Sequence, residues 1–232
     1  MGVDDELGGL SLGALDQLSR AVHVPEAGLH DTLVAILTGA VDLLDGVEGA
    51  GVNLFVKGQF SPQAVRGDAP PVLDELQQRT GSGPCIDASR EQRTIEIADT
   101  RTERRWPEFT ALAVSLGVWS MLCVPLWIDD RRLGSLSLYG SVPNGRSATM
   151  TGIAGLYATH AALALGDAQR TENLRRALDN RDVIGQAKGI LMATRGLLAD
   201  DAFAVLVTTS QQLNRKLVDV AAELTVTGAL PT

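Results

Sequence analysis

Hydrophobic positions near the C-terminus recur with the period of a helix in three successive segments. In 181–195, 200–213 and 215–227 apolar side chains return every three or four residues, which places them on one face of each helix. The predicted core positions are Val183, Ile184, Ala187, Ile190, Leu191, Phe203, Leu206, Val207, Leu217, Val220, Ala221 and Leu224. Asn214 suits the N-cap of the third helix, and Gly228 follows its end. Three short amphipathic helices predict a small bundle.

The preceding part of the chain alternates between helical and strand periods. Helices are predicted at 10–22, 29–44, 73–78 and 106–116, and strands at 51–56, 63–66, 94–97, 120–127 and 133–139. The last two strands meet across Asp129 and Asp130, which suits a hairpin. The residues from Gly81 to Pro84 interrupt regular structure before Cys85. Hairpins combined with helical insertions predict an α+β domain with an antiparallel sheet rather than a doubly wound parallel one.

A continuous helix is predicted to join the two parts, because no proline occurs from Thr149 to Leu230. The apolar residues near one heptad seam are Ile153, Leu156, Leu163, Leu174, Ala177, Ile184 and Leu191. Around 150–166 this seam fits burial against the chain's own sheet as well as it fits a parallel coiled coil between two copies. For 170–195 we expect dimerisation, with Leu174, Ile184 and Leu191 among the packing residues.

Two glycines lie one turn apart inside this helix. Gly185 and Gly189 each cost about 1 kcal/mol relative to alanine in a helix interior. Close packing can offset that cost. The pair fits equally well a close approach of the third helix of the same bundle and a contact with an external partner or RNA.

The same helix carries a basic stripe. Arg181, Lys188 and Arg195 recur every seven residues and therefore lie on one side of it, and Arg215 and Lys216 stand at the start of the third helix. The whole chain has 20 basic and 28 acidic residues, a net charge of −8. Residues 1–169 hold 12 basic and 21 acidic side chains, whereas 170–232 hold 8 and 7. The acidity belongs to the N-terminal part, and a charge run by itself fits a solvated helix face.

Composition limits the class of protein. The 232 residues suffice for one large or two ordinary domains, and 45% hydrophobic with 21% charged residues is typical of a globular protein. No apolar run reaches the eighteen or so residues that span a bilayer. The N-terminus is acidic, with Asp4, Asp5 and Glu6, and lacks the basic start of a secretion signal. We therefore expect a cytoplasmic protein without a membrane partner.

No constellation of catalytic or metal-binding residues stands out. Cys85 and Cys123 are too few for a multi-thiolate zinc site or a disulfide framework, and buried thiols are expected, with a redox role for Cys85 as the alternative. His23, His30 and His160 fall in helical stretches and fit ordinary helix positions better than metal ligation. Neither a Ser-His-Asp arrangement nor a phosphate-binding glycine loop is visible. The sequence predicts a non-enzyme, and it names no cofactor.

Four collinear segments of the C-terminal part, 181–192, 201–203, 210–221 and 228–231, resemble the ANTAR family of RNA-binding transcription antitermination domains. The resemblance implies an all-α three-helix bundle that recognises paired RNA stem-loops. It assigns RNA contacts to Arg181, Lys188, Arg195, Asn214, Arg215 and Lys216. One departure is Leu198, where members often carry Thr or Ser three residues before the acidic residue, here Asp201. Loss of that cap costs about 1 kcal/mol and leaves the ordering of 196–200 open.

The N-terminal part resembles the GAF domain, a family of small-molecule sensor modules. The matching segments are 77–88, 105–107, 117–120, 124–126 and 134–139. The resemblance implies a six-stranded GAF-type antiparallel sheet flanked by helices, with a ligand pocket on one face. Relatives bind cyclic nucleotides, haem or a tetrapyrrole, and the ligand here is unknown. We expect an N-terminal helix at 1–24, a GAF-like domain at 25–168, and a linker helix with the ANTAR domain at 169–232.

Together the two resemblances imply a signal-responsive, RNA-binding regulator that acts by transcription antitermination. A signal at the GAF domain would change the pose or the dimer state of the ANTAR bundles, which bind two stem-loops in nascent mRNA as a homodimer. One alternative is a protein-interaction or sensor module without RNA binding. The other is a Cys-dependent GAF reductase, which we disfavour because no resolving thiol is expected near Cys85.

Overall fold

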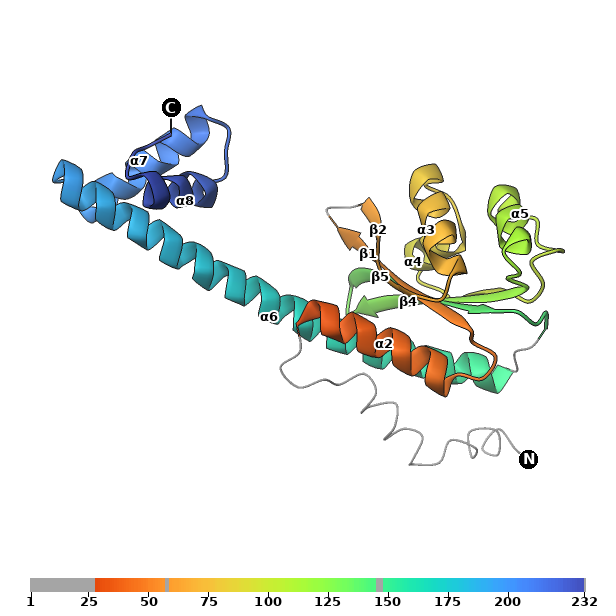
Figure 1. The fold of residues 1–232 in the computed structure, drawn as a ribbon. Helices are drawn as coiled ribbons and strands as arrows, with labels where there is room; N and C mark the ends of the chain where they lie inside the picture. Colours follow the sequence, from red (N-terminus) through yellow and green to blue (C-terminus); the bar gives the residue numbers. More distant parts are fainter. Residues whose placement is uncertain (1–27, 57–58, 145–147, 232) are drawn as a thin grey trace. The chain divides into compact units, whose positions relative to one another are not determined.

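The computed structural model describes residues 28–56, 59–144 and 148–231. The chain divides into two compact units between Gln169 and Arg170, and each is described by itself (Figure 1). The predicted helix at 10–22, the expected N-terminal helix at 1–24 and His23 lie outside the described residues. In the described part of the chain, no helix is long and apolar enough to cross a membrane.

The first unit is an antiparallel sheet between two helical layers, which confirms the α+β prediction. Its strands are β1 (Gly49–Val56), β2 (Gln59–Arg66), β3 (Ile95–Ile97), β4 (Ser120–Ile128) and β5 (Arg131–Gly140). They lie in the order β2-β1-β5-β4-β3. The family resemblance implied six strands, and this prediction was wrong, because the sheet of the described residues has five. Among the described residues only these five segments pair as strands of the sheet, and the stretches 67–94 and 98–119 between them form helices, turns and loops.

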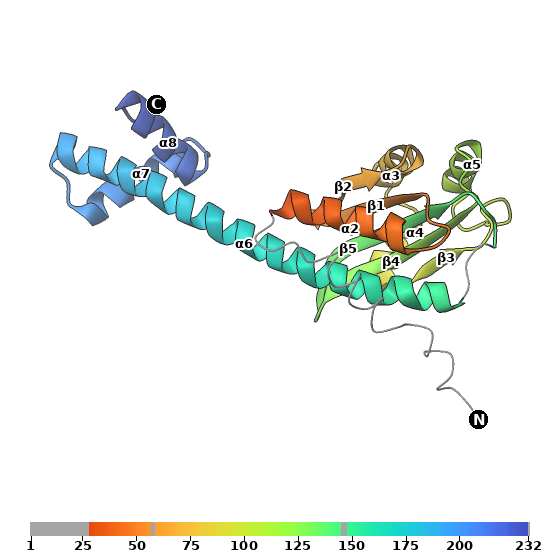
Figure 2. The same ribbon diagram turned by 60° about the horizontal axis from the view of Figure 1, so that its bottom comes forward.

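Helices cover both faces of this sheet (Figure 2). One face packs against α2 (Leu29–Leu43) and the first part of α6 (Ala148–Arg195), and the other against α3 (Ala69–Thr80), α4 (Pro84–Glu91) and α5 (Pro107–Ser115). Successive side chains of a strand point to opposite faces of the sheet. Leu136 and Leu138 of β5 therefore join the core under α2 and α6, whereas Tyr139 joins the core under α3, α4 and α5. The hydroxyl of Tyr157 on α6 donates to the Ile36 carbonyl at 2.6 Å, which ties α6 to α2.

Helix α4 was not predicted from the sequence. Gly81 ends α3 with φ 65°, and Gly83 adopts φ 152°, so the predicted break is real but short. A Cβ at Gly83 would lie 2.4 Å from the side chain of Gln77, so the close approach also requires glycine. Pro84 then occupies the first turn of α4, where a missing N–H costs nothing. The glycine-rich break therefore separates two helices rather than a helix and a loop.

The second unit contains the end of α6 with α7 (Ala199–Gln212) and α8 (Leu217–Thr227), as the spacing predicts. Its buried core residues are Ala187, Leu191, Ala202, Leu206, Val220, Ala221 and Leu224. Two sequence predictions fail. Asn214 is not the N-cap of α8: it adopts φ 50°, which asparagine tolerates, and Lys216 takes the cap position without a side-chain bond. Phe203 is 41% exposed, because Ala202 and Leu206 define the inward stripe of α7.

Helix α6 is continuous over 48 residues. In its first part Tyr157, Ala161 and Leu165 are buried, whereas the seam residues Leu156 and Leu163 are exposed. Small side chains on the buried face, such as that of Ala161, let α6 approach the sheet closely. This buried face is offset from the predicted heptad seam. Leu174 and Leu178 lie beyond this contact, and each is 60% exposed.

Candidate functional site

A surface hollow in the second unit brings together two of the predicted cations. It is lined by Ala177, Asn180, Arg181, Ile184, Gly185, Lys188 and Phe203 and encloses about 420 Å³. The Nζ atom of Lys188 lies 5.7 Å from the centroid of the Phe203 ring, a cation-π contact near its outer limit. None of the seven lining residues is acidic. We call this the aromatic hollow.

The other predicted RNA-binding residues lie elsewhere on the second unit. Arg195 is the exposed last residue of α6, two turns beyond Lys188. Arg215 forms an ion pair with Glu223 at 2.7 Å, so its charge is partly compensated within the bundle. Asn214 and Lys216 are exposed in the turn between α7 and α8. This turn is held by Ser210, whose hydroxyl donates to the Arg215 carbonyl at 2.6 Å.

The predicted packing residues of α6 separate into two groups. Leu191 is buried in the bundle core, and Ile184 is half-buried against it. Leu174 is exposed, and a Cβ added to Gly185 or Gly189 would meet nothing within 4 Å. The third helix of the bundle therefore does not require these glycines, since α8 makes no close approach there. The contact of this pair with an external partner or RNA stays a prediction.

The first unit buries a group of polar side chains beneath α3 and α4, which we call the interior polar cluster. Its members are Asn53, Asp74, Gln77, Cys85, Cys123, Ser135, Ser137 and Tyr139. The Tyr139 hydroxyl donates to Asp74 Oδ1 at 3.2 Å, and Gln77 Nε2 donates to the same atom at 3.4 Å. The backbone N–H of Cys85 donates to Gln77 Oε1 at 2.9 Å. The cluster thus links α3, α4 and the centre of the sheet.

Asp74 is the charged member of this cluster. Burial raises its pKa from 3.8 to about 7, and the neighbouring Asn53 and Tyr139 offset only part of the cost. Within the described residues, both side-chain polar atoms of Asn53, Asp74 Oδ2 and Ser135 Oγ are buried without a partner at hydrogen-bonding geometry, although Asn53 lies close enough to Asp74 to lower its pKa. Buried polar groups in native proteins nearly always have a partner. The cluster therefore has hydrogen-bonding capacity for water or a small polar molecule.

The positions of the two thiols show that one expectation from the sequence was wrong, namely that no resolving thiol lies near Cys85. Cys85 Sγ lies 3.5 Å from Cys123 Sγ, so a second thiol does stand beside Cys85. Both side chains are fully buried, and burial raises the pKa of Cys123 well above its ordinary value. A buried thiol with a raised pKa is a poor nucleophile. Burial, rather than the lack of a partner, is what argues against a Cys-dependent reductase here.

We expect both thiols to resist a bulky charged disulfide reagent in the native protein at about pH 8, because neither sulfur is exposed. The reagent releases a coloured thiolate when it reacts with a cysteine. This release should begin only on denaturation and then reach two equivalents, the cysteine content of the chain. Single Cys→Ser variants assign any residual reaction. Rapid labelling of Cys85 in the folded protein would contradict this expectation and restore the reductase alternative.

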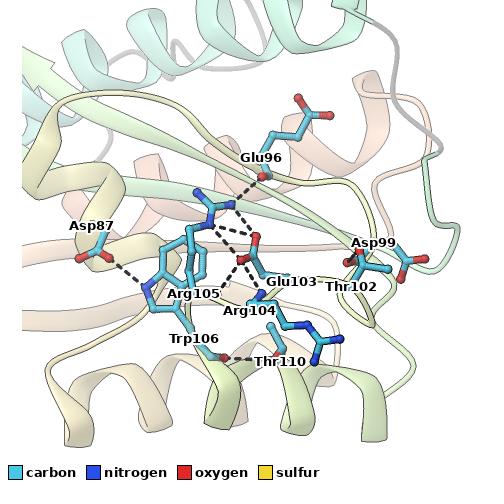
Figure 3. Close-up of polar contacts among 9 residues, drawn as sticks. All are labelled: Asp87, Glu96, Asp99, Thr102, Glu103, Arg104, Arg105, Trp106 and Thr110. Carbon is cyan, nitrogen blue, oxygen red and sulfur yellow. Dashed lines mark hydrogen bonds and ion pairs between the residues drawn. The ribbon is translucent and has the colours of Figure 1, made fainter.

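The loop before α5 carries a network of hydrogen bonds and ion pairs on the surface of the first unit (Figure 3). The guanidinium of Arg105 lies 4.4 Å from the Trp106 ring centroid and pairs with Glu103 at 2.6 Å. The Trp106 Nε1–H donates to Asp87 at 2.9 Å. Hydrogen bonds from Arg105 lower the pKa of Glu103 to about 2. These charges pair with one another and with Trp106, so the network holds the loop against α4.

Within the described residues, no group of three or more His, Cys, Asp or Glu side chains could hold a metal ion. His30 lies on α2 and His160 on α6. Sequence reasoning missed Asn180 and Phe203 of the aromatic hollow and Asp74 of the interior polar cluster. A signal for Asp74 was present, since it follows Leu73 directly and precedes Gln77 by three residues, which places it on the buried face of α3.

Comparison with known proteins agrees with the division of the chain into two units. A family model described as the GAF domain matches residues 26–166, and one described as the ANTAR domain matches 172–224. The GAF domain from Acinetobacter phosphoenolpyruvate-protein phosphotransferase is 17% identical with a TM-score of 0.56, covering 71% of this chain and 99% of its own. Free methionine-R-sulfoxide reductase from Neisseria meningitidis, in complex with its substrate, is 17% identical with a TM-score of 0.54, covering 70% and 95%.

A GAF domain/HD domain protein from Geobacter sulfurreducens is 16% identical with a TM-score of 0.51, covering 63% of this chain and 97% of its own. At such identities the likeness of all three structures is one of fold. A search among curated proteins finds no match.

Proposed function

Because this chain belongs to the GAF domain family and carries an ANTAR domain after its GAF domain, we propose that it is a signal-responsive RNA-binding regulator of transcription antitermination. It acts in the cytoplasm on stem-loops of nascent mRNA. The observation that carries the proposal is the aromatic hollow, where Arg181 and Lys188 stand together on an exposed helix face without an acidic neighbour in the lining. Cations in this arrangement supply phosphate affinity.

The charge distribution supports the same assignment. Residues 1–169 have a net charge of 12 minus 21, or −9, and 170–232 have 8 minus 7, or +1. The acidic first unit repels a polyanion, so RNA is directed to the second unit. Arg181, Lys188 and Arg195 provide the main contacts in this proposal, and Asn214 and Lys216, in the turn between α7 and α8, provide further ones. Arg215 contributes less, because Glu223 already neutralises it.

A homodimer through α6 is part of the proposal. Leu174 and Leu178 lie one turn apart on an exposed stretch of this helix, and a second copy would cover them. Two RNA sites in one dimer gain from effective concentration when two stem-loops lie on one transcript. Dimer formation can therefore raise RNA affinity without altering either site.

The proposed input is a small polar molecule at the interior polar cluster. The unpartnered atoms of Asn53, Asp74 and Ser135 support this, since a ligand can satisfy them at once. Helix α6 packs on the sheet of the first unit and continues into the second, so one element belongs to both. A signal that alters the packing of α6 can therefore change how two copies pair.

The proposed function is tested with RNAs that carry one or two adjacent hairpins, offered to the full chain at low salt. We expect the two-hairpin RNA to bind at least about tenfold more tightly than the one-hairpin RNA. Leu174→Glu with Leu178→Glu should abolish the difference and yield monomers by sedimentation. Equal affinity of monomer and dimer for the two-hairpin RNA contradicts dimer control. Absence of binding to either RNA removes the RNA-binding function and leaves a protein-interaction module.

A further inference from the structure

An aromatic side chain stands in the wall of the aromatic hollow where the helical pattern predicted a core residue. Phe203 is 41% exposed, and its neighbour Ala202 takes the buried position on α7. Single exposed apolar residues are ordinary on protein surfaces. Here, however, the ring lines a hollow shared with two cations, and Lys188 Nζ lies 5.7 Å from its centroid. A flat apolar face beside positive charge matches a nucleotide, which combines a flat base with an anionic phosphate.

Another part of the lining is backbone rather than side chain. Gly185 lines it from α6, and a Cβ at this position would meet nothing within 4 Å. Glycine in a helix interior costs about 1 kcal/mol relative to alanine, and within the described residues no close packing at this Cβ position offsets that cost. Glycine permits a ligand to approach the backbone closely. The hollow therefore has one aromatic wall and one bare wall.

Asn180 completes the lining on the polar side. Its amide carries both donor and acceptor groups, and it lies one position before Arg181 on the same helix. An amide of this kind can bond the edge of a base, which the cations alone cannot distinguish. The hollow thus offers a stacking surface, an edge-reading group and phosphate-binding charges.

We propose that the aromatic hollow receives one unpaired nucleobase of the bound RNA, stacked on Phe203, with Asn180 at the base edge and Arg181 and Lys188 on the adjoining phosphates. This inference rests on the proposed RNA binding and assigns its base-reading subsite. Sequence-specific RNA recognition targets unpaired bases, because paired bases turn their edges away from side chains. The cation-π contact of Lys188 is long and weak, so the base replaces it and the ammonium moves to phosphate.

The experiment uses the full chain and a two-hairpin RNA whose loops are randomised and then enriched by binding to the wild-type protein. Affinity is measured against salt concentration for Phe203→Leu, Phe203→Tyr and Lys188→Gln. Phe203 is exposed, so Phe203→Leu leaves the bundle core intact, which helical circular dichroism verifies. We expect Phe203→Leu to weaken binding about tenfold with an unchanged salt slope, and Phe203→Tyr to bind like the wild type. Lys188→Gln should instead reduce the salt slope by about one.

A second measurement locates the base directly. Ultraviolet crosslinking of the enriched RNA, followed by digestion and mass spectrometry, should join a loop nucleotide to the peptide that contains Phe203. Gly185→Leu, which fills the hollow, should remove this crosslink and weaken binding at least as much as Phe203→Leu.

Two results overturn the proposal and are distinguishable. If Phe203→Leu binds the enriched RNA as the wild type does while Lys188→Gln weakens binding, RNA binding stands and the base subsite is wrong. If no RNA is enriched by the wild-type protein, the proposed function itself is wrong and the subsite falls with it.

Discussion

Asp74→Asn is expected to make the first unit more stable than the wild type by up to about 4 kcal/mol at about pH 8, and to leave stability unchanged below about pH 4. In the fold, burial raises the pKa of Asp74 to about 7, whereas the unfolded chain has the ordinary value of 3.8. The folded protein therefore keeps a proton that the unfolded chain releases between these values. Wild-type stability falls as pH rises through this window, and an amide, which never ionises, avoids the loss.

The substitution keeps the geometry of the interior polar cluster. Asparagine retains an oxygen to accept from the Tyr139 hydroxyl and the Gln77 amide. Urea unfolding followed by tryptophan fluorescence provides the measurement. The three tryptophans, Trp106, Trp119 and Trp127, all belong to the first unit.

Asp45→Asn is the matched control, since Asp45 is exposed and its neutralisation should give no comparable gain. A stability difference between Asp74→Asn and the wild type that is the same at about pH 4 and about pH 8 would show that folding does not raise the pKa of Asp74 and would refute the argument.

Neutralising the basic stripe is expected to weaken RNA binding by roughly a hundredfold or more at about 0.1 M salt. The variant carries Arg181→Gln, Lys188→Gln and Arg195→Gln. Removing one phosphate contact also lowers the slope of log affinity against log salt by nearly one unit, so the slope should fall by about two to three. The affinity difference should shrink as salt rises, because counterion release is then worth less.

The control removes three positive charges from the first unit through Arg104→Gln, Arg131→Gln and Arg132→Gln, whose side chains are exposed. Net charge changes equally in both variants, so an effect of overall charge appears in both, whereas an effect of the stripe appears in one. Filter binding over a salt series supplies the affinities. Equal loss in the two variants would mean that the stripe has no special place in RNA recognition.

Much of the fold could be predicted from local periodicity. The hairpin of β4 and β5, the long α6 and the order of the bundle helices depend on patterns that span a few residues, and the structure confirms them. The prediction of Asn214 as an N-cap fails, because an asparagine before a helix can also adopt a left-handed turn. Helix α4 was missed, because glycine and proline mark a break without showing whether a helix or a loop comes next.

The candidate site was predictable only in part. The seven-residue spacing placed Arg181 and Lys188 on one side of α6, and both line the aromatic hollow. Phe203 was assigned to the core, because Phe203 and Ala202 are neighbours and the period alone does not show which of them faces inward. The rotation of α7 about its axis is set by how α6 and α8 pack against it.

The sequence by itself determined most of the helices and the strands, except α4, and also which unit carries the acidic charge and which helix face is basic, because these depend on residues close together in the chain. Only the tertiary structure decided that Asp74 lies among unpartnered polar atoms, that Cys123 stands beside Cys85 and that Phe203 faces outward. Each depends on elements far apart in the chain, and burial and packing between such elements set the cost of a charge or the exposure of a ring.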